Sequence, residues 1–230
     1  MSTTATSIAA GAWLHNPVTG EIARVNLAPS ETDGRRVGVD LWLQPGAAVA
    51  RAHLHDHFAE HFEVRDGEVG FQLDGDERAA HAGDGPVVVP AGTLHDWWNT
   101  GDGVAHVAVE VEATPTAPGQ PAMRFISMIE ALWSLAALGR TNDAGLPDPL
   151  WVAAIAREYA DAIRLHRPPA AVQSALFGPL AAVARRTGRD PLAAELHGPG
   201  AACAIADPGE DGLADLLARP VGARAARRGA

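Results

Sequence analysis

Apolar and polar residues alternate in several short segments in the first half of the chain. Val37, Val39 and Leu41 occupy every second position, and residues 69–73 and 104–112 repeat this pattern. Because successive side chains of a strand point to opposite faces, the alternation predicts strands with one buried face. Asp-Gly and Pro-Gly turn signals separate the segments at intervals of about 8 to 12 residues, which is typical of an all-β sandwich or barrel.

The pattern changes near Thr114, where a Pro-rich stretch precedes apolar residues at helical spacing. We expect a first helix over 123–138 that is apolar on more than one side and therefore buried. A second helix, with Asp148 as its N-cap and Pro149 as its first residue, should stop before Pro168, and a third should cover 170–186. The chain then divides into a barrel (1–113), a connector (114–122), a helical extension (123–189) and a mostly disordered tail (190–230).

The charged residues exclude several classes of function. All 18 basic residues are Arg, so lysine Schiff-base chemistry and a phosphate-binding P-loop lysine are excluded. The net charge of −10 argues against a nucleic-acid partner. The sequence has no uncharged apolar run of about 18 residues, so we expect no membrane span and a cytoplasmic protein.

The histidines are concentrated in the predicted β half. His53, His55 and His57 alternate, which on one strand would place their side chains on one face about 6.6 Å apart. Two such imidazoles can converge on an ion at about 2.0 to 2.1 Å each, although the same pair also occurs on exposed strands. Glu60 alternates in phase with neighbours that look core-facing, so its side chain could also point inward. His95 follows a turn that would place it as a further ligand.

Two longer motifs contain these residues. The HXH(X)4E(X)6G part of G(X)5HXH(X)3–4E(X)6G is matched by His53, His55, Glu60 and Gly67. The pattern G(X)5PXG(X)2H(X)3N is matched by Pro90, Gly92, His95 and Asn99, and the leading glycine of each motif is offset by one residue. Through these motifs, residues 37–112 resemble the cupin superfamily. Residues 16–21, the pair Trp97-Trp98 and residues 145–164 also look like those of bacterial single-domain cupins with a helical C-terminal extension.

The resemblance implies a mainly β fold, a double-stranded β-helix (jelly-roll) barrel, with one divalent transition metal in its mouth. The implied ligands are His53, His55, Glu60 and His95. Iron is our first expectation, with manganese, nickel, cobalt, copper and zinc as alternatives, because these ligand types do not select one ion. The leading functional hypothesis is an oxygen-using dioxygenase acting on a small organic molecule. The alternatives are a zinc-type cyclase, isomerase or lyase, and a small-ligand-binding protein without catalysis.

Further residues are candidates for the site around the ion. Besides Glu60, His57 is a candidate catalytic group, either as a general base or as a hydrogen-bond partner of a metal ligand. The alternative is that His57 has no role in the site and is a partly exposed residue at the end of a strand. Phe62, Phe71 and Trp97 are candidates for an apolar substrate wall, and the ordinary explanation of an apolar strand residue is plain core. Arg51 could bind an anionic substrate or lie on the surface.

The helical extension has three alternative roles: packing on the closed side of the barrel, covering its mouth as a lid, or forming a homodimer interface. A lid would bring Met123, Phe125, Trp133 or Trp151 into the substrate pocket.

Overall fold

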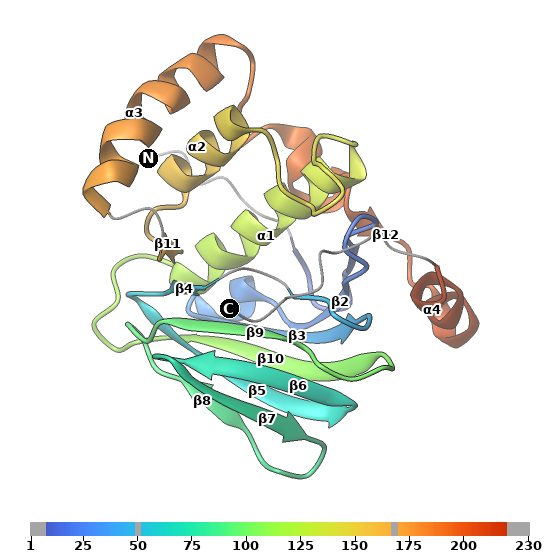
Figure 1. The fold of residues 1–230 in the computed structure, drawn as a ribbon. Helices are drawn as coiled ribbons and strands as arrows, with labels where there is room; N and C mark the ends of the chain where they lie inside the picture. Colours follow the sequence, from blue (N-terminus) through green and yellow to red (C-terminus); the bar gives the residue numbers. More distant parts are fainter. Residues whose placement is uncertain (1–7, 49–51, 167–169, 220–230) are drawn as a thin grey trace.

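The computed structural model describes residues 8–48, 52–166 and 170–219, and it contains two antiparallel sheets with the helices of residues 121–186 on one side (Figure 1). The seven-stranded sheet has the order β12-β1-β2-β3-β10-β5-β8, and the five-stranded sheet has the order β11-β4-β9-β6-β7. The expected jelly-roll barrel followed by helices is confirmed. The strands are β1 (Trp13–His15), β2 (Ile22–Leu27), β3 (Arg36–Leu43), β4 (His53–Leu54), β5 (Phe58–Asp66), β6 (Glu68–Leu73), β7 (Asp76–His81), β8 (Val87–Val89), β9 (His95–Asn99), β10 (Ala105–Ala113), β11 (Arg164–Leu165) and β12 (Ala204–Ile205).

The alternation seen in the sequence determines which face of each strand is buried. On β10, Val107, Val109 and Val111 point into the barrel and are at most 7% exposed. Val109 lies opposite Phe62 of β5, which is fully buried. Glu60 shares this inward face, so the strand that builds the core also brings a carboxylate into the interior.

The helices follow the β segment, as their sequence pattern predicts. They are α1 (Pro121–Ala137), α2 (Pro149–Glu158), α3 (Ala170–Arg186) and α4 (Gly209–Leu217), with short 3-10 turns η1 (Pro29–Thr32), η2 (Ala194–Leu196) and η3 (Gly198–Gly200). Asp148 caps α2 by accepting bonds from the amides of Leu150 and Trp151. α2 ends ten residues before Pro168, because the chain then extends to form β11. No helix in the described part of the chain combines the length and apolarity needed to cross a membrane.

The expectation of a mostly disordered tail is wrong for residues 190–219. β12 pairs with β1, with Trp13 opposite Ile205, and the side chains of Leu196 and Cys203 are almost completely buried. Single apolar residues separated by Gly and Pro anchor this segment, so it has no periodic signal in the sequence. β11 and β12 also come from beyond residue 113, and both extend the sheets of the barrel.

The expectation of one strand through His53, His55 and His57 is also wrong. β4 contains only His53 and Leu54, and the chain bends before β5 starts at Phe58. Strand parity therefore does not determine the direction of His57, which is half-buried.

Candidate metal centre

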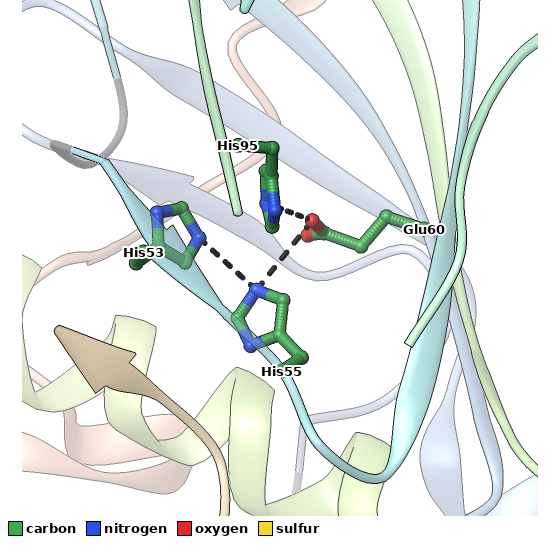
Figure 2. Close-up of side chains that lie close together, drawn as sticks. All are labelled: His53, His55, Glu60 and His95. Carbon is green, nitrogen blue, oxygen red and sulfur yellow. Dashed lines mark hydrogen bonds and ion pairs between the residues drawn. The ribbon is translucent and has the colours of Figure 1, made fainter. Parts of the chain in front are cut away.

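Four buried polar side chains converge between the two sheets (Figure 2). His53 lies on β4 and His55 directly follows it, while His95 of β9 is the cross-strand neighbour of His53. Glu60 approaches from β5 in the facing sheet. One ligand atom from each residue lies within 4.8 Å of the others, and all four residues are at most 4% exposed.

The distances between these atoms fit ligands of one ion. The Nε2 atoms of His53 and His55 are 3.0 Å apart, and Glu60 Oε2 is 3.5 Å from His55 Nε2 and 2.8 Å from His95 Nε2. Two donors about 2.1 Å from an ion and at right angles to each other would lie about 3.0 Å apart. Among the described residues, neither Glu60 Oε2 nor His95 Nε2 has a well-directed hydrogen-bond partner. Buried polar atoms without such a partner, facing each other across this gap, fit a divalent metal.

Backbone carbonyls orient two of the imidazoles. His55 Nδ1 lies 2.6 Å from the carbonyl oxygen of Ala162, and His95 Nδ1 lies 3.0 Å from that of Thr93. A carbonyl only accepts hydrogen bonds, so each Nδ1 carries the hydrogen and donates it. The Nε2 lone pairs then point to the centre of the cluster, as metal ligation requires.

The electrostatics of the cluster favour a positive charge at its centre. Burial by itself would raise the pKa of the Glu60 carboxyl, but the facing His55 and His95 rings hold it well below its usual range. Burial would lower the pKa of His95, but the facing Glu60 carboxylate raises it. An anionic oxygen is thus maintained in the interior, where it would bind a cation.

An apolar cavity of about 80 Å³ lies beside the cluster. His53 and Glu60 form its polar edge, and the rest of its described lining carries no ionisable group. The barrel contributes one wall, and α1, which lies above the strands in Figure 1, contributes most of the other. The lining residues of α1 are Phe125, Ile126, Met128, Ile129, Leu132 and Trp133.

The comparison with known families agrees with this site. Residues 41–112 match the sequence model described as the Cupin domain. Residues 41–112 form a cupin domain. All four candidate ligands lie within the matched residues. Among curated proteins, none matches the chain.

Several solved structures resemble the cupin domain. A predicted oxalate decarboxylase from Thermotoga maritima is 21% identical over 41% of this chain and 81% of its own, with a TM-score of 0.38. A sugar phosphate isomerase from a cupin superfamily, from Silicibacter pomeroyi, is 25% identical over 44% of this chain and 64% of its own, with a TM-score of 0.38. An uncharacterized conserved protein with a double-stranded beta-helix domain, from Klebsiella pneumoniae, is 26% identical over 40% of this chain and 71% of its own, with a TM-score of 0.35. These matches cover less than half of this chain, and their TM-scores are below 0.5.

The other predicted site residues lie at different depths in the cupin domain. Trp97 lines the cavity. Phe62 and Phe71 are fully buried behind it, with ring centroids 4.8 Å and 6.4 Å from that of Trp97. His57 belongs neither to the four-residue cluster nor to the cavity lining, and Arg51 lies outside the described residues. The roles proposed for these residues in substrate binding or catalysis stay predictions.

The lid alternative for the helical extension agrees with the position of α1. Phe125 and Trp133 line the cavity, whereas Met123 and Trp151 do not. The sequence signal for this arrangement was the apolar character of α1 on more than one side. The carbonyl of Ala162 had no sequence signal, because every residue carries the same backbone group.

Proposed function

We propose that this protein is a metal-dependent cupin enzyme acting on a small organic substrate with an apolar body. The observation that carries the proposal is that two candidate ligands, His53 and Glu60, also form the polar edge of the apolar cavity. A substrate in the cavity would therefore lie directly against the ion. At about 80 Å³, the cavity is about half the size of an apolar cavity of roughly 150 Å³ that takes up benzene, so it fits a short apolar chain or branch.

The chain's own residues would bind the ion and exclude water. Three imidazoles and one carboxylate would hold it and leave two positions of a six-coordinate ion open for the chelating end of a substrate or for substrate and dioxygen. A redox-active ion would supply oxygen activation there, whereas zinc would polarise a carbonyl. The apolar walls of the barrel and α1 would orient the substrate and exclude bulk water.

The cavity lining favours the oxygen-using alternative. Isomerases, cyclases and lyases commonly use a positioned proton donor or acceptor besides the ion. Among the described lining residues, only His53 and Glu60 are ionisable, and both are candidate ligands. We therefore propose dioxygenase chemistry on an enol, thiol or hydroxyketone, with iron as the first ion to test.

Metal analysis and oxygen uptake test this proposal. Protein purified without added metal is analysed for bound ions, stripped, and reconstituted separately with iron, manganese, nickel, copper, cobalt and zinc. Each form is then assayed for oxygen consumption with a panel of small enols, thiols and hydroxyketones. We expect uptake with one redox-active ion and none with zinc.

Other outcomes would contradict parts of the proposal. Anaerobic turnover with a zinc form would replace the dioxygenase by a non-redox enzyme. Ligand binding without turnover in every form would indicate a binding protein, and absence of metal binding would refute the metal site itself.

A further inference from the structure

The metal ligand His55 is oriented by a segment outside the matched cupin domain. Its Nδ1 donates to the carbonyl of Ala162, 107 positions away in the sequence, at 2.6 Å. Ala162 is fully buried between α2 and β11, in residues 158–165, which we call the strap. The direction of the His55 ring therefore depends on the exact position of the strap.

The downstream end of the strap is attached to the ligand-bearing strand. β11 pairs with β4, which places Leu165 opposite His53 and Arg164 opposite Leu54. Arg164 also forms an ion pair with Asp56 at 2.8 Å. Strand pairing thus holds this end of the strap beside the HXH segment.

Arg124 of α1 holds the upstream end. Its guanidinium donates to both carboxylate oxygens of Asp161, at 3.1 to 3.3 Å, and to the Glu158 carboxylate at 3.1 Å. It also donates to the backbone carbonyl of Glu158 and lies 4.6 Å above the ring of Tyr159, which is fully buried. The planar guanidinium of Arg124 therefore contacts the side chains, the backbone and the aromatic ring of the turn that leads to Ala162.

We infer that Arg124 is a positioning residue for the metal ligand His55, acting through the strap. It holds the Glu158–Asp161 turn, and this turn places the Ala162 carbonyl that keeps His55 Nε2 directed to the ion. Groups that hydrogen-bond a metal ligand without touching the metal affect metal affinity, because they determine the orientation and basicity of that ligand. The inference rests on the metal site of the proposed function and is independent of the reaction catalysed there.

The test compares metal binding by the full chain and its variants. Zn²⁺ affinity is measured by titration against a competing chelator for the wild type, Arg124→Ala, Arg124→Lys and Arg36→Ala. Arg36 is the matched control, because it forms a similar two-nitrogen contact with Glu110 on the exposed face of the sheet. Loss of such a group weakens metal binding by about 10- to 100-fold. We expect about 10-fold for Arg124→Ala, partial recovery for Arg124→Lys and no change for Arg36→Ala.

A spectroscopic measurement separates positioning from general destabilisation. In the zinc-loaded wild type, the His55 Nδ1 proton should give a slowly exchanging NMR signal, because the bond to Ala162 protects it. This proton should exchange faster in Arg124→Ala, while that of His95, which is bonded to Thr93, should not change. If Arg124→Ala does not fold, Asp161→Asn weakens the same contact with an isosteric side chain and takes its place.

The outcomes for the inference and for the proposed function are distinct. A wild type that binds no metal contradicts the proposed function. A wild type that binds zinc, together with an Arg124 variant of equal affinity and unchanged Nδ1–H exchange, overturns the inference alone. Equal losses in Arg124→Ala and Arg36→Ala would also overturn it.

Discussion

Replacing Glu60 by Gln tests the metal centre directly. The change keeps the size of the side chain and removes the anionic oxygen that lies 2.8 Å from His95 Nε2 and 3.5 Å from His55 Nε2. Because Glu60 is 3% exposed, bulk water has little access to the position of this oxygen. We therefore expect the variant to fold and to lose most of its affinity for a divalent ion.

The magnitude follows from linkage between binding and folding. An ion present at 100 times its Kd stabilises the wild type by about 2.7 kcal/mol. For a chain of this length, 1 kcal/mol shifts the Tm by about 2 to 4 °C, so the metal should raise the Tm by about 5 to 11 °C. Loss of a group that hydrogen-bonds a metal ligand weakens metal binding by about 10- to 100-fold. Loss of a ligand itself should therefore weaken metal binding by at least about 100-fold. At the same metal concentration, the stabilisation of Glu60→Gln then falls to about 0.4 kcal/mol or less.

Differential scanning calorimetry with and without metal measures this difference. His61→Gln is the control, because His61 is adjacent on β5 but faces outward, 3.8 Å from Glu112. It should keep the full metal-dependent rise in Tm, whereas Glu60→Gln should show a rise of about 2 °C or less. Equal rises in both variants would refute the assignment of Glu60 as a ligand.

Three further predictions concern the cavity, the helical extension and the tail. Ala23→Leu, which places a larger side chain in the cavity, should leave metal affinity unchanged and abolish substrate-dependent oxygen uptake; unaltered uptake would contradict the cavity as the substrate site. Asp148→Ala removes the cap of α2 and should cost about 1 kcal/mol in urea unfolding at neutral pH. Burial alone would raise the pKa of Asp148, but Arg189 and two amides lower it, so its contribution is present above about pH 3.8 and should fade as the pH falls further. Burial alone would lower the pKa of His197, but Glu130 raises it, so its contribution is present below about pH 6.5 and is lost as the pH rises through the folded-state pKa. The free energy of unfolding of the wild type relative to His197→Gln should therefore fall between pH 6 and pH 9, and a constant difference would contradict this assignment.

The candidate ligands were predictable because short-range geometry determines most of their arrangement. The HXH spacing brings His53 and His55 together, and the parity of Glu60 with the core residues of β5 directs it inward. The pairing of His53 with His95 across β4 and β9 is a long-range contact, and only the turn before His95 and the motif resemblance indicated that His95 lies at the site. The same parity argument failed for His57, because the chain bends between β4 and β5.

The parts of the site that the sequence did not indicate depend on backbone groups and on packing between distant segments. The carbonyl of Ala162 is chemically identical to that of every other residue, and only the fold places it at His55. The apolar surface of α1 predicted burial, but three packing partners were compatible with it. The order of the tail depends on a few anchors such as Leu196, whose contacts are not local in sequence.

The helical extension and the candidate site belong to one physical unit. Without the strap, the Nδ1–H of His55 would lose its acceptor in a buried environment, where an unpaired polar group costs about 1 to 3 kcal/mol. Without α1, the apolar cavity would lose one wall, and water would reach His53 and Glu60. Arg124 and Phe125 are neighbours on α1, yet one holds the strap and the other lines the cavity. A displacement of this helix would therefore change both the orientation of a candidate metal ligand and the shape of the cavity beside it.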